Sequence, residues 1–146
     1  SASKYPDVID YGYVQDNLPN IKYFENCLTW NIDGSIGKVY YRQGRFSLSE
    51  KVIPLILQEQ YKTKLDVFFL KYIIETTFNK QRFNFNNKAG KSKIKDILID
   101  IPIDTSGEFD LFFQREIAEK YNKAEYLKNI VLKELENIKN TMIDIM

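Results

Sequence analysis

The segment Gln81–Ser92 interleaves cationic, amide and aromatic side chains. Amides and guanidinium groups can form paired hydrogen bonds with the edges of nucleic-acid bases, and ammonium and hydroxyl groups suit phosphates. On a strand, Phe83 and Phe85 would face inward, while Arg82 and Asn84 would face outward. The alternative is a solvated loop without a ligand, which is the more common origin of a Lys- and Asn-rich stretch.

Cations are concentrated in two windows that contain no acidic residue. The window Gly34–Ser49 has three cations, and the window Thr76–Lys95 has six. The rest of the chain therefore holds 12 of the 21 cations and all 20 acids, although the net charge of the whole chain is only +1. If the two windows folded side by side, the molecule would have a cationic surface and an anionic remainder.

The sequence lacks the residues of most catalytic centres. It has no histidine, which excludes His-based acid–base catalysis, Ser-His and Cys-His pairs and nearly all zinc sites. It also has no Gly-rich phosphate loop. Its single cysteine, Cys27, fits a reducing setting and is expected to be a buried thiol. No apolar run reaches the roughly 18 residues that span a membrane. We therefore expect a non-catalytic, cytoplasmic chain without a metal site.

The apolar pattern of the first two thirds predicts an α+β body with a small mixed twisted sheet and one packed helix. Asp66 is the expected N-cap of that helix, which should end near Phe78. Residues Tyr5–Glu25 are expected to be largely irregular. The expected strands are Cys27–Ile32, Ile36–Tyr41, Val52–Leu57 and Ile94–Ile103, with turns at Asp33–Ser35 and Gln43–Gly44.

The last third predicts one long helix, so that residues 4–107 form the body and residues 108–146 the helix. The segment Thr105–Glu108 has capping-box spacing and should open it. Apolar residues then recur at alternating steps of four and three, as in a coiled coil. Lys128 lies in this seam and either fixes its register or extends outward along it. The expected interface residues are Ile117, Tyr121, Ala124, Val131, Leu135, Ile138 and Met142.

Four segments occur in an order that resembles a known family. They are Asp33–Gly37, Leu65–Tyr72, the loop Ala89–Ser92 before a strand that closes with Ile101–Ile103, and Gln114–Ala118 at the start of the long helix. In this order, and over nearly the whole chain, they resemble the target-recognition domain of type I restriction–modification specificity subunits.

The resemblance implies that the domain reads one half of a split sequence in double-stranded DNA. The long helices would pair, set the distance between half-sites and dock methyltransferase subunits, in a complex that can also include a restriction subunit. S-adenosylmethionine would be bound by the methyltransferase, so this chain would carry no cofactor. With one domain and one helix, it would be a half-subunit, pairing with a copy of itself or a second half, or a fragment. The alternatives are the recognition part of a fused methyltransferase–endonuclease and a coiled-coil adaptor with a protein-binding head.

Both cation-rich windows are candidates for DNA contact. In the first, the alternative is an amphipathic hairpin whose tyrosines pack. In the second, Arg82, Asn84 and Asn86 are the expected contacts to base edges, and the lysines should contribute affinity that falls with salt. The expected DNA-binding residues are Lys38, Tyr40, Arg42, Arg45, Lys80, Gln81, Arg82, Asn84, Asn86, Asn87, Lys88, Lys91 and Lys93.

Overall fold

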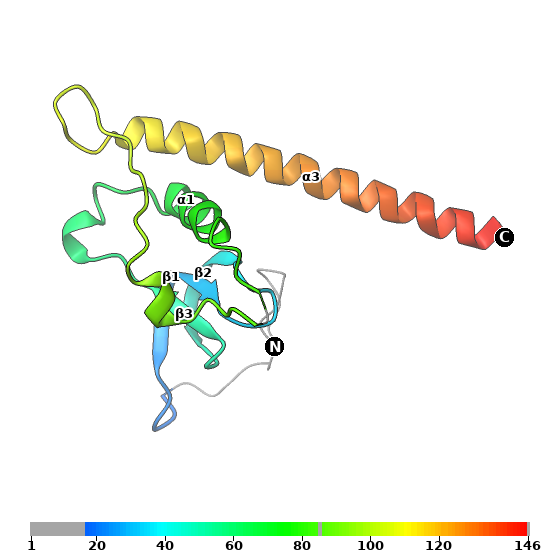
Figure 1. Cartoon of the computed structure of the whole chain (residues 1–146), viewed down its shortest axis with the longest axis horizontal. Coiled ribbons are helices and arrows are strands. Elements are labelled where there is room, and N and C mark those ends of the chain that lie inside the picture. The colour runs from blue at the N-terminus through cyan, green and yellow to red at the C-terminus, as the bar shows by residue number, and fades with distance from the viewer. Residues whose placement is uncertain (1–16, 85, 146) are drawn as a thin grey trace.

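The computed structural model describes residues 17–84 and 86–145, which form an α+β body with one long helix projecting from it (Figure 1). The expected fold class is confirmed, although the three described strands are all antiparallel and the sheet is not mixed. The sheet order is β2-β1-β3. The elements are β1 (Tyr23–Asn31), β2 (Val39–Ser47), β3 (Val52–Leu55), the 3₁₀ turn η1 (Glu59–Tyr61), α1 (Val67–Asn79), α2 (Lys91–Ile94) and α3 (Leu111–Ile145).

The hairpin of β1 and β2 contains the expected turn but a longer return strand. The turn is closed by the backbone N–H of Gly37, which donates to the carbonyl of Asn31 at 3.1 Å. The prediction of a second turn at Gln43–Gly44 is wrong, because β2 continues through it. Gly44, with a φ of +74°, lies at a register shift, and its N–H donates to the side chain of Asn26 at 2.8 Å. A bulge thus takes the place of the turn, since it also accommodates a left-handed glycine.

The core lies between the sheet and α1 and is centred on Trp30, which is fully buried. Its ring meets the ring of Phe78 edge to face, with centroids 4.7 Å apart. Its indole N–H donates to the carbonyl of Ala89 at 3.0 Å, so the polar atom of the buried ring is satisfied. Val39 of β2 and Phe69 of α1 complete the centre of this cluster.

The segment predicted as a strand at Ile94–Ile103 is not one. Ile94 lies in α2, and the residues that follow it pair with no strand except at an isolated bridge between Ile103 and Phe109. Ile97, Ile99 and Ile101 nevertheless pack against the core, whereas Leu98 is 88% exposed. An alternating apolar and polar pattern indicates that one side of an extended segment is buried. It does not require that the segment form backbone hydrogen bonds with another strand.

The two main helices begin at carboxylates. Asp66 is the N-cap of α1, as expected, and its side chain accepts from the N–H groups of Phe68 and Phe69 at 3.0 and 2.9 Å. The expected capping box at Thr105–Glu108 does not open α3. That segment forms a turn with Gly107 at a φ of +84°, and α3 begins after Asp110, whose carboxylate accepts from the N–H of Phe113 at 2.8 Å.

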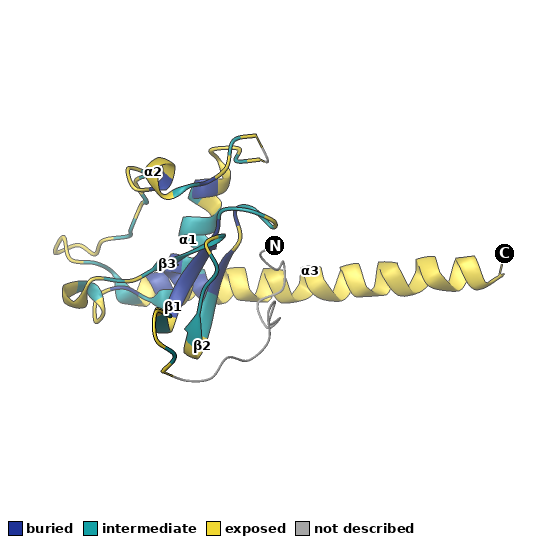
Figure 2. Cartoon of the chain, turned by 90° about the horizontal axis from the view of Figure 1, so that it is seen from below, coloured by how far each residue is buried: buried dark blue, intermediate teal, exposed yellow. Residues whose placement is uncertain are grey.

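Helix α3 leaves the body soon after it begins. Ala118 is its last buried residue, and every residue from Glu119 to Ile145 is exposed (Figure 2). Helix α1 lies between the first turns of α3 and the sheet (Figure 1). At 1.5 Å per residue, α3 is about 52 Å long, so most of it forms a projecting arm.

Candidate nucleic-acid interface

The two cation-rich windows come together at one end of the β1–β2 hairpin. The ammonium of Lys88, from the second window, lies 3.1 Å from the carboxylate of Asp33, which directly precedes the first. The next residue, Ala89, accepts the hydrogen bond from the indole of Trp30 in β1. The two windows therefore fold side by side at the turn end of the hairpin, which is the condition for a shared cationic surface.

The β1–β2 turn is locked against the C-terminal half of α1. Gly37 has a φ of +86°, and a Cβ added to it would lie only 2.3 Å from the side-chain oxygen of Asn79. Glu75 of α1 accepts from the backbone N–H of Val39 at 2.8 Å and lies 3.5 Å from the ammonium of Lys38. The turn and Lys38 are thus held at a fixed position relative to the end of α1, from which residues 80–95 continue.

Asp33 joins three parts of this surface. Its carboxylate accepts from the N–H of Gly34 at 2.9 Å and pairs with Lys88, while the ammonium of Lys51, at the start of β3, lies 4.0 Å away. The N–H of Gly34 and then the hydrogen bond from Lys88 hold the pKa of Asp33 below its ordinary value of 3.8. The carboxylate therefore stays charged at neutral pH and can hold both lysines beside the turn.

The loop after α1 is folded by its own amide side chains. The side-chain oxygen of Asn84 accepts from the N–H groups of Asn86 and Asn87, both at 2.9 Å. The ammonium of Lys93 donates to the side chain of Asn87. Asn84, expected to contact base edges, thus uses its acceptor within the loop, whereas Arg82 and Asn86 expose their side chains.

The expected alternation of aromatic and polar side chains in this loop is present where it is described. Phe83 is partly buried, with its ring 6.1 Å from that of Trp30, while Arg82 is exposed. Phe85 lies outside the described residues. The backbone here forms a turn rather than a strand, with Arg82 at a φ of +53° and an isolated bridge between Asn84 and Asn87.

The arginines of the first window lie elsewhere. The guanidinium of Arg42 lies over the ring of Tyr40, 5.6 Å from its centroid. Arg45 lies over the ring of Tyr23 at 4.5 Å and donates to the side chain of Asn17 at 3.1 Å. From the start of β2 to Arg45 is about 20 Å at 3.3 Å per residue. Arg45 therefore lies at the far end of the hairpin, and Arg42 lies in the middle of β2, opposite Cys27.

The structure therefore divides the predicted DNA-binding residues into separate places. Tyr40 is only 6% exposed, and burial, followed by the nearby Glu75, raises its pKa to about 12. It is a packing residue, which is the alternative that the sequence left open for the tyrosines. Arg42 lies in the middle of β2, and Arg45 lies toward its far end. The predicted residues from the turn and the loop after α1 are Lys38, Lys80, Gln81, Arg82, Asn84, Asn86, Asn87, Lys88, Lys91 and Lys93, hereafter the turn–loop surface.

Sequence reasoning missed Lys51 as a member of this charge cluster. It lies outside both windows and follows Glu50, so no local charge pattern distinguishes it. It reaches Asp33 because β3 is the neighbour of β1 in the sheet. Asp33 was the only indication in the sequence that could have pointed to Lys51. It lies in a tight turn next to a cationic window, and a carboxylate in that position attracts lysines from adjoining strands.

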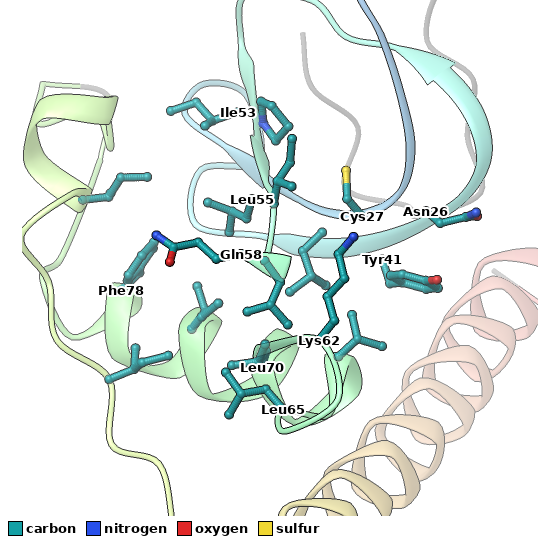
Figure 3. Close-up of a pocket in the computed structure, with 18 of the residues that line it drawn as sticks. Asn26, Cys27, Tyr41, Ile53, Leu55, Gln58, Lys62, Leu65, Leu70 and Phe78 are labelled. Carbon is teal, nitrogen blue, oxygen red and sulfur yellow. The ribbon is translucent and has the colours of Figure 1, made fainter. Parts of the chain in front are cut away.

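An apolar groove of about 880 Å³ opens between β3, α1 and α2. Leu55, Leu70 and Phe78 line it, together with the buried thiol of Cys27 (Figure 3). Burial raises the pKa of Cys27, so its reactive thiolate form is disfavoured. Lys91 of the turn–loop surface also lines this groove. Within residues 17–84 and 86–145, no group of three or more Cys, Asp or Glu side chains is arranged to hold a metal ion.

None of the helices in the described part of the chain is both long and apolar enough to cross a bilayer.

Comparison with known proteins places this arrangement in a family. The model of the type I restriction modification DNA specificity domain matches residues 8–140. Searches among curated proteins and among solved structures found no match. The matched range contains the whole turn–loop surface, the packed helix α1 and all but the last turns of the arm. The chain therefore belongs to the family of type I restriction–modification DNA specificity domains.

Proposed function

We propose that this chain reads one half-site of a bipartite DNA target through the turn–loop surface and docks methyltransferase subunits through α3. Family membership supports a DNA-recognition role in restriction–modification. The observation that carries the proposal is the junction of the two cation-rich windows, where Lys88 meets Asp33 and Ala89 meets Trp30. This junction builds one surface of cations and amides from segments far apart in the sequence.

The chemistry of the turn–loop surface supports a division between affinity and sequence reading. The exposed lysines Lys80, Lys91 and Lys93 carry charge suited to phosphates. Arg82 and Asn86 are exposed at the bend of the loop, where their planar groups can reach base edges. Asn84 forms the bend through its bonds to the backbone, so we assign it to shaping the loop rather than to reading bases.

The exposed stripe on α3 supports a role in assembly. Val131, Leu135, Ile138 and Met142 are 56–62% exposed. They lie beyond Ala118, the last buried residue of α3, where the helix has left the body. They are therefore available to a helix of another subunit, either a second copy or a second specificity half.

Catalysis is assigned to the partner. Specificity domains of this family are generally non-catalytic subunits. We assign S-adenosylmethionine and methyl transfer to an associated adenine methyltransferase and cleavage to a restriction subunit. This chain then supplies the choice of sequence.

The proposal predicts that a neighbouring gene encodes an adenine methyltransferase. The test is to express the chain with that methyltransferase and to map methylated positions on a DNA library. A defined bipartite sequence should be methylated only when both proteins are present. Arg82→Ala should relax the preference at one position of one half-site by about 1–3 kcal/mol, or roughly 5- to 150-fold. Lys80→Ala should instead weaken binding to every sequence. It should also reduce the slope of log K against log salt concentration by about 0.9 for each lost phosphate contact.

Lys139→Ala, on the exposed arm, is the matched control and should leave both sequence preference and salt dependence unchanged. Methylation that is independent of sequence, or an Arg82→Ala profile identical to that of the unmodified chain, would contradict the assignment of the turn–loop surface.

A further inference from the structure

The first point at which α3 is attached to the body is Gln114. This side chain is fully buried, and its oxygen accepts from the backbone N–H of Asp66 at 2.9 Å. Its amide nitrogen donates to the carbonyl of Lys64 at 3.2 Å. One side chain thus ties the first turn of α3 to the chain that enters α1. Ile117 and Ala118 pack against the core about one turn further on, but these contacts end there and leave the rest of a long helix free to tilt.

A second attachment lies about two to three turns further along α3. The rings of Tyr72 and Tyr121 are stacked, with centroids 5.1 Å apart and planes at 18°. The hydroxyl of Tyr72 donates to the carboxylate of Glu125 at 2.9 Å, and the ammonium of Lys71 lies 3.3 Å from the same oxygen. A further contact joins the hydroxyl of Tyr72 to the side chain of Asn122 at 3.4 Å. We call Lys71, Tyr72, Tyr121 and Glu125 the arm joint.

The ionisation of the joint favours this arrangement near neutral pH. Burial, and then the hydrogen bond to Glu125, raises the pKa of Tyr72, so its hydroxyl remains a donor. Burial opposes ionisation of Glu125, but the hydrogen bond from Tyr72 and the charge of Lys71 outweigh it and lower the pKa of the carboxyl. A neutral phenol and a charged carboxylate form a strong, charge-assisted hydrogen bond.

A small tilt at the joint moves the tip of α3 a long way, because no residue in the described part of the chain supports the helix beyond it. Glu125 is 11 residues from Gln114 and 20 from Ile145, or about 16 and 30 Å along the helix. A tilt of about 20° at the joint would therefore move the tip by about 10 Å. Because successive base pairs are 3.4 Å apart, this movement equals about three base pairs.

We propose that the arm joint positions the arm, fixing the direction in which α3 leaves the recognition body and thereby the number of base pairs between the half-sites. The part of this inference that concerns DNA rests on the proposed function. Lys71, Tyr72, Tyr121 and Glu125 act as positioning residues and contact neither base nor phosphate. Gln114 attaches the arm, and the joint aims it.

The direction of the arm can be measured without DNA. Spin labels at Thr63→Cys on the body and Asn140→Cys on the arm, in a Cys27→Ala chain diluted with unlabelled protein, report one intramolecular distance. The unmodified joint should give a narrow distribution. Tyr72→Ala and Tyr121→Ala should broaden it by about 10 Å, the movement expected from the lever. Tyr72→Phe and Glu125→Gln should have smaller effects, because they retain the ring stack.

Matched controls lie on the same helix, at exposed positions outside the joint. Tyr126→Ala and Glu136→Gln remove the same chemical groups from exposed positions and should leave the distribution narrow. If Tyr72→Ala and Tyr121→Ala gave the same narrow distribution as these controls, the joint would not aim the arm and the inference would be wrong.

The effect on DNA is read from spacing rather than from total activity. With the methyltransferase partner, half-sites separated by different numbers of base pairs should be methylated at one preferred spacing, and Tyr121→Ala should extend methylation to spacings up to about three base pairs away. A loss of activity at all spacings in equal proportion would indicate a structural role only and would overturn the inference. Absence of methylation with the unmodified chain would overturn the proposed function, while the label distances would still decide whether the joint aims the arm.

Discussion

Gly37 is the residue at which the β1–β2 turn meets the end of α1. Its φ of +86° favours glycine, and its missing side chain leaves room for the side-chain oxygen of Asn79. Gly44 has a similar φ, +74°, but no atom lies within 4 Å of the Cβ that it lacks. Both glycines have a positive φ, but only Gly37 has a neighbouring side chain where a Cβ would lie. They therefore form a matched pair for mutation.

Both Gly→Ala substitutions should therefore destabilise the fold, but not equally. Gly44→Ala should cost about 1–2 kcal/mol from the left-handed backbone alone. Gly37→Ala should cost more, because Asn79 must also move. In an Asn79→Ala background the two costs should become similar. Urea denaturation measures each free energy of unfolding. Equal costs in the unmodified background would contradict the proposed contact between the turn and α1.

The stability that the contacts of Asp33 contribute to the fold depends on pH. Because the folded pKa lies below the ordinary value of 3.8, its contacts contribute stability above that pH, and the contribution is lost as the pH falls through the folded pKa. Lys88→Met should raise the pKa of Asp33 only part of the way to 3.8, since the bond from Gly34 remains. Carbon NMR of the carboxyl group measures this change. Lys38→Met, which removes the partner of Glu75, should leave Asp33 unchanged.

Gln114 shows how a whole element depends on one polar group. It is buried where α3 crosses the entrance to α1, and it satisfies the N–H of Asp66 and the carbonyl of Lys64. Both groups belong to the loop between η1 and α1, outside any strand or helix. The Gln-x-x-Ile-Ala segment that helped to identify the family therefore has a physical role, which is to join two helices through hydrogen bonds from a side chain to the backbone.

Gln114→Leu should consequently destabilise the protein although it adds apolar volume at a buried position. Each unsatisfied backbone group should cost about 1–3 kcal/mol. The exposed Gln43→Leu provides the control and should change the free energy of unfolding little. Urea denaturation followed by circular dichroism distinguishes the two. A Gln114→Leu protein as stable as the control would show that water replaces the lost bonds.

The seam on α3 drifts around the helix. A seven-residue repeat slips about 20° per heptad against a straight helix. Its first expected members lie beside the body: Ile117 packs against the core, and Tyr121 stacks on Tyr72. Val131 and Ile138 lie only about 40° and 60° around the helix from Ile117. They are each 57% exposed because α3 has left the body before it reaches them. The expected coiled-coil interface is thus divided between the chain's own body and a surface that remains available.

At the scale of the whole molecule, the compact body and the exposed arm should respond differently to mutation. Val131→Lys with Ile138→Lys should abolish self-association through the arm while leaving the melting temperature of the body unchanged. Asn129→Lys with Asn140→Lys adds the same charge on another side of α3 and serves as the control. Sedimentation over a range of concentrations measures the association. Identical sedimentation of the two double variants would argue against pairing through this stripe.

Patterns in the sequence predicted several features that the structure or the family comparison confirms. They include the α+β class, the Asp-Gly hairpin, the Asp66 cap, the long helix, and the ordered segments that identify the family. The hairpin, the cap and the long helix each depend on residues close together in the sequence, so short-range chemistry is sufficient for them, whereas the family resemblance rests on the order of segments along nearly the whole chain. The same reasoning mistook one-sided burial at Ile94–Ile103 for a strand and a bulge at Gly44 for a turn, because both alternatives satisfy the same local pattern.

The tertiary structure decided which predicted contacts share a surface. Tyr40 and Arg45 lie in one cationic window with Lys38, yet one is buried and the other lies toward the far end of β2. Lys51, outside both windows, lies beside Asp33. Membership of a surface depends on strand order and on which helix covers which face, and these follow from the packing of distant segments around Trp30. The sequence alone therefore indicated the chemistry of the candidate site, and long-range packing determined its composition.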